Sequence, residues 1–472
     1  MSSDSAGVSI VAVDTGGTFT DVVAWIDGTV RVLKLASTPA DPSTAVIEGV
    51  RQVLAAADAA GTFILVHGST VATNALLERR GARVALVTNR GFEDVIEIGR
   101  QNRPQLYALV GTRPPPLVAR ADRHGIAGRL GADGAEIEPL DGAEIDGLAD
   151  RVADADSIAI CLLHSYANDA HEQRVARSLG RLARPVSVSS ELLPEFREYE
   201  RTATTVANAY VSTLMDRYLG EIERACGARR VRVMGSGGGA IPVSRARREA
   251  VHTILSGPAG GVIGARAVAR DAGYDTIMTF DMGGTSTDVS LCPGRLLHTR
   301  EFSIAGAPIA IPVLDIHTVG AGGGSIARVD AGGALRVGPE SAGAVPGPIC
   351  YGRGGAEITV TDANVWLRRL PAGSWPHPLS GATAAGARDR GERARAAAGA
   401  EASGRDAGRR AGGGLDRDAI EAPLARLAHA LGTGLDAAAE GVIAVANAAM
   451  EGALRVISVE RGYDPADFTM VC

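Results

Sequence analysis

One eight-residue pattern occurs twice in this chain, as Asp14-Thr-Gly-Gly-Thr-Phe-Thr-Asp21 and as Asp281-Met-Gly-Gly-Thr-Ser-Thr-Asp288. Each copy follows a short apolar run and precedes another, which predicts a strand, a tight turn and a second strand. A single copy would also fit a glycine-rich hairpin without a ligand. Two copies that agree at the same positions disfavour chance, and their wide separation indicates a duplicated domain rather than a short solenoid repeat.

The residue types in this turn suit a polyphosphate. The backbone N–H groups of Gly16 and Gly17 can approach phosphate oxygens closely because glycine has no side chain, and Thr18 and Thr20 carry hydroxyl donors. Asp14, at the end of its strand, can accept hydrogen bonds from magnesium-bound water. Two such turns that face each other across a cleft could hold one triphosphate from both sides. The sequence contains no P-loop motif and no strand-linked G-x-G-x-x-G motif.

Strands and helices alternate around the two turns, which predicts an α/β fold. The segment 8–38 predicts a three-stranded meander, and a second meander is expected over 276–304. Further strands are expected at 63–68, 82–89, 157–164, 185–190 and 231–234, and helices at 44–60, 71–81, 171–182 and 195–225.

Four segments are expected along the chain. Residues 8–190 form the first half-domain, and residues 191–370 form the second, which carries the second turn. Residues 371–414 are rich in Ala, Gly and Arg and have almost no large apolar residues, so they are expected to be disordered or aberrant. Residues 415–472 predict two amphipathic helices and the start of a strand, which stops within the element.

The composition is that of an ordinary globular protein. The chain has 472 residues, of which 46% are hydrophobic and 22% charged, and a formal net charge of −6. Its few arginine runs lack interleaved aromatic residues, which argues against nucleic-acid binding. The five cysteines form no C-x-x-C pair, which favours reduced, buried thiols. A polar N-terminus and the lack of an apolar run of membrane-spanning length predict a cytoplasmic protein without membrane contact.

Longer motifs around the turns resemble the hydantoinase A and oxoprolinase family. The resemblance covers residues 8–370 and 415–471. Its motifs are HGSTVATNALLERRG, GFEDVIEIGRQNRPQLY, EFREYERTATTVANAYV, ILSGPAGG, FDMGGTSTDVS, DIHTVGAGGGSIARVD, PGPICYGRGG and VISVERGYDPADF. More broadly, the two turns and residues 256–264 resemble elements of the actin, sugar kinase and heat-shock chaperone superfamily. The resemblance implies a duplicated actin-like ATPase (ribonuclease H-like) fold, with two half-domains around a nucleotide cleft.

The family resemblance implies an ATP-dependent hydrolase subunit that opens a cyclic amide, of the hydantoin or 5-oxoproline type, by phosphorylating the carbonyl oxygen. It implies ATP and Mg²⁺ as cofactors and a separate hydantoinase B-type subunit as partner. Phosphorylation converts a resonance-stabilised carbonyl into an electrophile with a good leaving group, so catalysis depends on positioning and charge neutralisation. Two alternatives remain open: a ketone carboxylase-type subunit that phosphorylates a carbonyl or enol oxygen, and a non-catalytic nucleotide-binding or scaffold protein.

The resemblance also assigns roles to residues of the two turns. Asp281 and Asp14 are the expected catalytic carboxylates and Mg²⁺ ligands, directly or through water, and Asp281 is expected to lie nearest the transferred phosphoryl group. Nucleotide contacts are expected from Gly16, Gly17, Thr18, Thr20, Gly283, Gly284, Thr285 and Thr287, and from Gly322 and Gly323 in a glycine-rich loop. A purely structural loop is the competing interpretation for the last two residues.

A polar substrate is expected to contact residues outside the turns. The arginines among them present a planar fork that suits carboxylates. The candidates are His67, Asn74, Arg100, Asn102, Arg103 and His317. Surface salt bridges for the arginines and a packed core position for His317 are the competing interpretations. The histidines have no short ligand spacing, which argues against a transition-metal site.

Two segments depart from the family pattern. Family members continue past a strand like residues 467–471 into a Gly-Gly turn that packs against the adenine, and residues 371–414 resemble nothing in the family. One hypothesis, a frameshift or a misread GC-rich stretch, explains both departures. On this expectation the chain keeps both phosphate turns and lacks the wall that holds the adenine.

Overall fold

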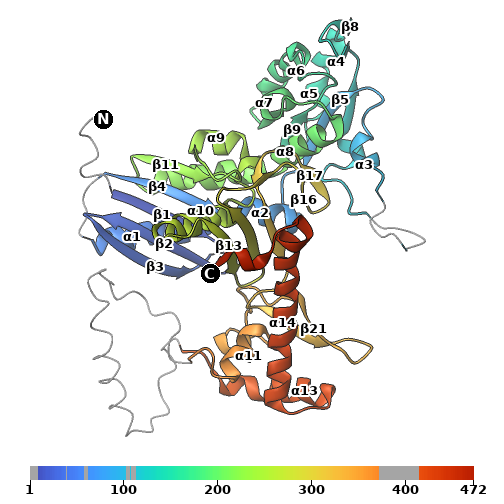
Figure 1. Ribbon diagram of the computed structural model, residues 1–472. Coiled ribbons are helices and arrows are strands. Elements are labelled where there is room, and N and C mark those ends of the chain that lie inside the picture. The colour runs from blue at the N-terminus through green and yellow to red at the C-terminus, as the bar shows by residue number, and fades with distance from the viewer. Residues whose placement is uncertain (1–8, 39, 58–61, 103–106, 108–112, 372–413) are drawn as a thin grey trace.

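The computed structural model describes residues 9–472 except 39, 58–61, 103–106, 108–112 and 372–413. Two mixed sheets lie at the centre of the molecule, one lobe of helices and a small sheet projects to the upper right, and a second lobe, mostly helical, projects downward (Figure 1). The α/β class expected from the sequence is therefore confirmed.

The first central sheet begins with the predicted meander. Its strand order is β12-β11-β4-β1-β2-β3. The strands are β1 (Ser9–Thr15), β2 (Phe19–Ile26), β3 (Thr29–Ala36), β4 (Phe63–Ser69), β11 (Arg230–Met234) and β12 (Ala240–Pro242). Burial alternates along β1, because successive side chains point to opposite faces. The buried face carries Val11, Val13 and Val22 and packs beneath α1 (Pro42–Ala55) and α8 (Glu198–Ala225).

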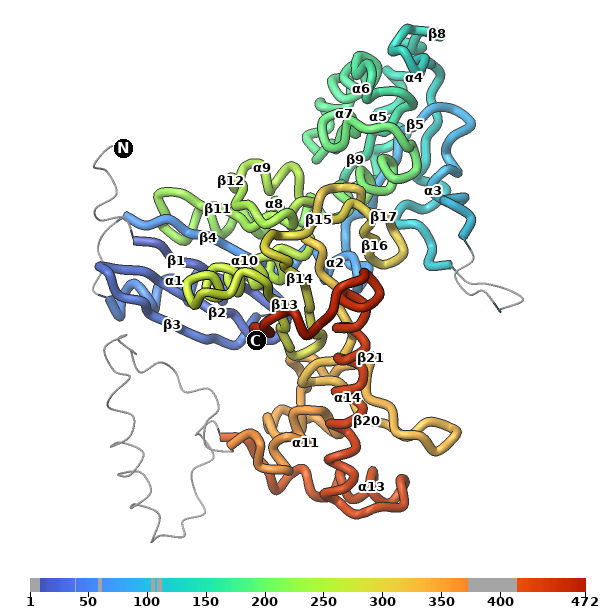
Figure 2. The backbone as a smooth tube through the Cα atoms, in the orientation of Figure 1, coloured from blue at the N-terminus to red at the C-terminus, as the bar shows by residue number. Residues whose placement is uncertain are grey.

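The second central sheet repeats the arrangement of the first. Its order is β19-β14-β13-β22, with β13 (Thr276–Met282), β14 (Thr287–Pro293), β19 (Ile316–Val319) and β22 (Thr469–Val471). Each sheet has an antiparallel meander and a fourth strand parallel to the first strand of that meander. Figure 2 shows the C-terminal strand returning to the middle of the molecule, where it pairs with β13. The duplication predicted from the two turns is present in the strand topology.

Two helices cover the second sheet. The helix α10 (Ser256–Asp271) contributes Ala259 and Val262 to a cluster on the face that carries Ile277 and Cys292. On the opposite face, α14 (Leu435–Ile457) contributes Ala453 and Ile457 to a second cluster. The two faces of the second sheet are therefore covered by different helices.

The division expected at residue 190 does not coincide with the boundary of the first sheet. The helix α8 and the strands β11 and β12 follow this residue and still belong to the first sheet and its core. A separate core forms instead within the first half, around a four-stranded sheet in the order β10-β9-β5-β6. Its elements are β5 (Val84–Asn89), β6 (Arg123–Ile126), β9 (Ser157–Ile160), β10 (Val186–Val188), α4 (Gly142–Asp146), α5 (Leu148–Arg151), α6 (Ala170–Leu179) and α7 (Ser189–Leu192).

The lower lobe contains the helices expected after residue 415. It is formed by β20 (Ser325–Val329), β21 (Leu335–Ser341), α11 (Val360–Trp366), α13 (Glu421–Leu431) and most of α14. Almost all of residues 371–414 lie outside the described residues. The remaining elements are α2 (Val71–Leu77), α3 (Val95–Ile98), α9 (Val243–Arg248), β7 (Arg129–Leu130), β8 (Glu136–Glu138), β15 (His298–Thr299), β16 (Phe302–Ile304), β17 (Ala307–Ile309) and β18 (Val313–Leu314).

One expectation about apolar segments is wrong. The segment Leu435–Arg461, which contains α14, is long and apolar enough to cross a membrane by length and composition. Its apolar residues include Val442 and Ile457, which pack into two hydrophobic clusters of the protein. Four of the five cysteines are buried free thiols, as expected, whereas Cys472 is exposed.

Candidate functional site

The two glycine turns have the same backbone structure and face each other. Gly16 N–H donates to the Phe19 carbonyl at 2.9 Å, and Gly283 N–H donates to the Ser286 carbonyl at 2.8 Å. A Cβ atom built on Gly284 would lie 3.1 Å from the Thr18 hydroxyl oxygen, so the two turns are in contact. A side chain at position 284 would require Thr18 to shift, so glycine favours this close approach of the turns.

Asp14 lies at the end of β1 in a crowded but solvent-accessible position. A Cβ atom on Gly68 of β4 would lie 2.9 Å from its Oδ1, and one on Gly257 of α10 would lie 3.1 Å from it. Burial and, to a smaller extent, the charges of Asp21 and Asp281 raise the pKa of Asp14 to about 6, against the opposing charge of Lys34. The ionised form of Asp14 is therefore disfavoured, because the carboxylate is partly removed from water and lies near two other carboxylates.

Asp281 occupies the matching position at the end of β13. A Cβ atom on Gly261 of α10 would lie 3.8 Å from its Oδ2, so one helix passes both carboxylates with glycines four residues apart. Burial and the charge of Asp21 raise the pKa of Asp281. Two carboxylates whose pKa values are both raised by burial and by the charge of Asp21 form a site suited to a hard cation. Mg²⁺ needs only one or two carboxylates when phosphate and water complete its shell. No group of three or more potential metal-binding side chains occurs in the described parts of the chain.

A row of polar side chains crosses each meander beside these carboxylates. In the first sheet the register places Asp14 beside Asp21 and Asp21 beside Lys34, whose ammonium group lies 2.7 Å from the Asp21 carboxylate. In the second sheet the equivalent row is Asp281, Asp288 and Thr318, and the Thr318 hydroxyl donates to Asp288. Burial raises the pKa of Asp288 to about 6, and the Thr318 hydrogen bond opposes this rise.

Lys34 is a candidate site residue that sequence reasoning missed. Its charge lowers the pKa values of both Asp14 and Asp281, so it acts on the whole carboxylate pair. The signal was available in the sequence, because an Asp27-Gly28 turn within the predicted meander sets the register that places residue 34 opposite residue 21. The two sheets thus differ at this position, because the first has the Lys34 ammonium group where the second has the Thr318 hydroxyl.

Two predicted nucleotide contacts are wrong. The side chains of Thr20 and Thr287 are fully buried at equivalent positions of the two hairpins. The Thr20 hydroxyl is bonded to the Ser37 hydroxyl at 3.1 Å, and the Thr287 hydroxyl donates to the Ala321 carbonyl. Both side chains lie on the buried face of their sheet, because successive residues of a strand point to opposite faces. Thr18 and Thr285 remain accessible at the turns.

The glycine-rich loop at 320–325 lies directly behind the second turn. Gly323 N–H donates to the Gly283 carbonyl at 3.0 Å, and Gly322 N–H donates to the Ser325 hydroxyl at 2.9 Å. A Cβ atom on Gly322 would lie only 2.8 Å from backbone atoms of the turn. The amides of Gly322 and Gly323 are thus engaged within the chain, so the loop supports the second turn, which agrees with the structural interpretation.

Two predicted substrate residues lie away from the cleft. His67 is fully buried, with Nδ1 3.0 Å from the Val13 carbonyl and Nε2 2.7 Å from the Tyr218 hydroxyl, and burial lowers its pKa to about 4. His317 pairs with Val289 on the face of the second sheet that packs against α14, opposite the face of Asp281. The prediction of substrate contact is wrong for both histidines.

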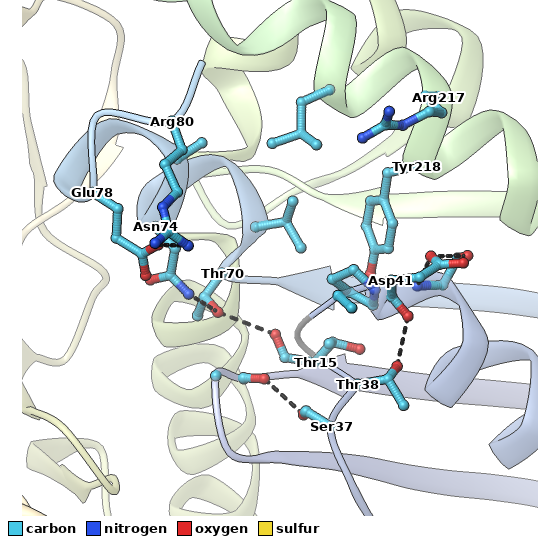
Figure 3. Close-up of a pocket in the computed structure, with 18 of the residues that line it drawn as sticks. Thr15, Ser37, Thr38, Asp41, Thr70, Asn74, Glu78, Arg80, Arg217 and Tyr218 are labelled. Atoms are coloured by element: carbon cyan, nitrogen blue, oxygen red, sulfur yellow. Dashed lines mark hydrogen bonds and ion pairs between the residues drawn. The ribbon is translucent and has the colours of Figure 1, made fainter. Parts of the chain in front are cut away.

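Asn74 is the predicted substrate residue that the structure brings to a turn. Its amide nitrogen lies 3.8 Å from the Cβ position of Gly17, and both residues line a cavity of about 610 Å³ (Figure 3). Arg100 and Asn102 line a different cavity that shares no lining residue with the first. Arg100 forms a bidentate ion pair with Glu200 at 2.6 and 2.8 Å, which is the salt-bridge alternative. Arg103 lies outside the described residues.

Comparison with known proteins identifies the family. Residues 201–403 and 407–472 match the hydantoinase/oxoprolinase family, and residues 10–182 match the N-terminal region of hydantoinase/oxoprolinase proteins. The chain belongs to the hydantoinase/oxoprolinase family. The family match runs through most of residues 371–414, so the expectation that this segment lies outside the family is wrong.

Several characterised hydantoinase/oxoprolinase relatives are similar over long stretches. Caprolactamase subunit alpha of Pseudomonas jessenii is 38% identical over 98% of this chain and 64% of its own length. 5-Oxoprolinase 1 of Arabidopsis thaliana is 38% identical over 75% of this chain and 31% of its own length. A nucleotide-free acetone carboxylase structure has a TM-score of 0.80 at 29% identity, covering 98% of this chain and 65% of that one. The chain thus spans less than two thirds of the length of these relatives.

Proposed function

We propose that this chain binds Mg²⁺-ATP between its two glycine turns, in a duplicated actin-like fold, and phosphorylates the carbonyl oxygen of a small cyclic amide. One observation carries the proposal: Asp14 and Asp281 end equivalent strands and flank two contacting turns of identical backbone structure. The Gly16 and Gly283 amides close their own turns, so the donors proposed for the phosphates are the remaining groups of the turns, among them the Thr18 and Thr285 hydroxyls. Such donors beside carboxylates match the charge pattern of a metal-bound polyphosphate.

The residues present fit a magnesium ion. Burial and like charges raise the pKa values of Asp14 and Asp281, so a divalent cation between them would relieve unfavourable charge in both carboxylates. A bound Mg²⁺ supplies charge neutralisation and a template for in-line transfer. Lys34 supplies a further positive charge from the neighbouring strand. Thr18 and Thr285 supply hydroxyl groups at the tips of the two turns.

The proposed transfer is balanced as follows. The amide carbonyl oxygen attacks the γ-phosphorus, a new O–P bond forms, and the bond from the γ-phosphorus to the bridging oxygen breaks. ADP leaves with the electron pair, and the amide nitrogen loses its proton, which leaves an O-phosphorylated imidate whose C=N group is uncharged. Ring opening then completes a net reaction in which the cyclic amide, ATP and two water molecules give an amino acid, ADP and phosphate.

The names of the relatives support this reaction class. The relatives include an ATP-dependent caprolactamase and 5-oxoprolinases, whose names specify cyclic amides. They also include acetone carboxylase and the acetophenone carboxylase gamma subunit, which favour ketone phosphorylation as the second candidate. Because two of the relatives are named as subunits, we propose that a separate B-type subunit completes the ring opening.

The test is formation of ADP from Mg²⁺-ATP by the chain in the presence of hydantoin, 5-oxoproline, 2-pyrrolidinone, or a ketone with bicarbonate. Stimulation by a cyclic amide, with ¹⁸O from the labelled carbonyl appearing in a phosphorylated product, is the expected result. Asp281→Asn should reduce this turnover at least about 100-fold, because the charge it provides acts mainly in the transition state. Stimulation by the ketone alone would replace the proposal by the second candidate. ATP binding without any stimulated turnover would indicate a non-catalytic nucleotide-binding protein.

A further inference from the structure

The cavity beside the first turn is lined in part by Gly16 and Gly17, which also belong to the proposed phosphate site. Gly16 and Gly17 line it on one side, and Asn74 of α2 and Arg217 and Tyr218 of α8 line it on the others (Figure 3). Its volume of about 610 Å³ lies in the range of small-molecule sites. A molecule bound in this cavity and the proposed triphosphate would therefore both lie next to the first turn.

Polar groups without a full set of partners face this cavity. Thr15 is only 2% exposed, its hydroxyl makes no hydrogen bond of normal length among the described residues, and Tyr218 is the neighbouring side chain that interacts with it. A buried hydroxyl without a partner costs stability, so such groups are rare unless a ligand or water completes them. The Asn74 amide N–H donates to the Thr70 hydroxyl at 3.3 Å, and in the described structure its carbonyl oxygen accepts no hydrogen bond. An amide and a hydroxyl together suit the N–H and C=O groups of another amide.

The carboxylates around the cavity already have partners. Asp41 caps α1 and accepts from the Ser43 hydroxyl at 2.6 Å. Glu78 pairs with Arg80 at 3.2 Å, and Glu221 pairs with Arg224, a residue of the same helix.

Arg217 is different from these lining residues. Its guanidinium is exposed at the cavity and has no carboxylate within 4.0 Å in the part of the chain that the structure describes. It acts on Asp41 only as a more distant charge. An arginine fork that is free of ion pairs is suited to bidentate binding of a ligand carboxylate.

We propose that this cavity binds the phosphoryl acceptor and that Arg217 selects acceptors that carry a carboxylate in addition to the reacting amide. Thr15 and Asn74 hydrogen-bond the amide group beside the turn, and Arg217 of α8 holds the carboxylate. The inference rests on the proposed phosphorylation for the role of the ligand, but not for its binding. Arg217 is thus a specificity residue rather than a catalytic one.

A matched pair of ligands tests this selection. 5-Oxoproline and 2-pyrrolidinone share the same lactam ring, and only 5-oxoproline has a carboxylate. Calorimetric titration of the chain should show 5-oxoproline binding at least about tenfold tighter, which corresponds to one charge-assisted contact. Arg217→Gln should reduce this ratio to near one without changing the affinity for 2-pyrrolidinone. Arg51→Gln, an exposed arginine of α1 outside the cavity, removes the same charge and should leave the ratio unchanged.

A second variant tests the position of the amide. Thr15→Val keeps the side-chain shape and should weaken both lactams by a similar factor. Equal affinity of the wild type for the two lactams, or an equal loss in Arg217→Gln and Arg51→Gln, would overturn the selection by Arg217. The two proposals fail separately: lactam binding that depends on Arg217 without ADP formation contradicts only the phosphorylation. ADP formation with both lactams at equal KM contradicts only the selection.

Discussion

The raised pKa of Asp14 makes magnesium nucleotide binding depend on pH in a defined way. With a pKa of about 6, Asp14 is ionised in roughly one tenth of molecules at pH 5 and in roughly nine tenths at pH 7. If only the ionised carboxylate holds the cation, the association constant should rise by about tenfold over this range and then level off. The nucleotide also titrates here, so the quantity to plot is the ratio of the wild-type constant to that of Asp14→Asn, measured by calorimetry.

Asp288→Asn is the matched control for this experiment. Asp288 also has a pKa raised to about 6, but its carboxylate accepts a hydrogen bond from Thr318 and lies one strand away from Asp281. The wild-type to Asp14→Asn ratio should therefore rise with pH, while the wild-type to Asp288→Asn ratio should change much less. A flat ratio for Asp14→Asn between pH 5 and 7 would refute the assignment of Asp14 to the cation.

The raised pKa of Asp14 has the opposite effect on the stability of the nucleotide-free protein, which should fall as the pH rises. The folded pKa of Asp14 lies above the usual value of 3.8, so the stability it contributes is full below pH 3.8 and is lost as pH rises through about 6. Asp14→Asn should therefore raise the free energy of unfolding at pH 7 and have little effect at pH 4. Because the carboxylate is accessible to solvent, we expect a gain below about 1 kcal/mol. Urea titration at both pH values checks this sign, and destabilisation at pH 7 would contradict it.

Three further substitutions test the site and its support. Lys34→Met should weaken Mg²⁺-ATP binding about tenfold in calorimetry. Arg31→Met, on the opposite face of β3, is the control and should leave binding unchanged. Equal losses in the two variants would exclude a specific role for Lys34. Gly68→Ala places a Cβ atom 2.9 Å from the Asp14 carboxylate and should abolish most nucleotide binding, whereas Gly260→Ala, with open space around it, should preserve binding and raise the melting temperature. His67→Ala should lower the free energy of unfolding by roughly 2 to 4 kcal/mol in urea titration, because it removes a fully buried ring, and nucleotide affinity of the folded protein should not change. A large loss of affinity at unchanged stability would restore His67 to the site.

The local features of the fold were predictable because they depend on neighbouring residues. Alternating apolar residues and turn glycines predicted the first meander and the β13–β14 hairpin of the second sheet. The third strand of the second sheet, β19, follows the segment 276–304 in which it was expected, and β15 and β16 within that segment pair with other strands. The same local information identified Asp14 and Asp281, since each ends a strand immediately before a turn. It could also have identified Lys34, because hairpin register follows from the turn position.

The orientation of individual side chains depended on packing between distant segments. Whether Thr20 and Thr287 face the nucleotide depends on which face of each sheet α1, α8 and α14 cover. His67 is buried because Tyr218, far along the chain, lies over it. The membership of β11 and β12 in the first sheet likewise depends on pairing across more than one hundred intervening residues, which no local pattern encodes.

The duplicated turn was therefore determined by the sequence alone, whereas its function as a site depends on tertiary structure. Six matching positions specify the backbone of each turn and its carboxylate, since these depend on glycine conformations and strand register. In the folded protein, Thr18 lies against Gly284, and the glycines of α10 lie beside the two carboxylates. A cavity also forms beside Gly17. These contacts join residues from both halves of the chain, and their energy comes from packing surfaces that are far apart in the sequence.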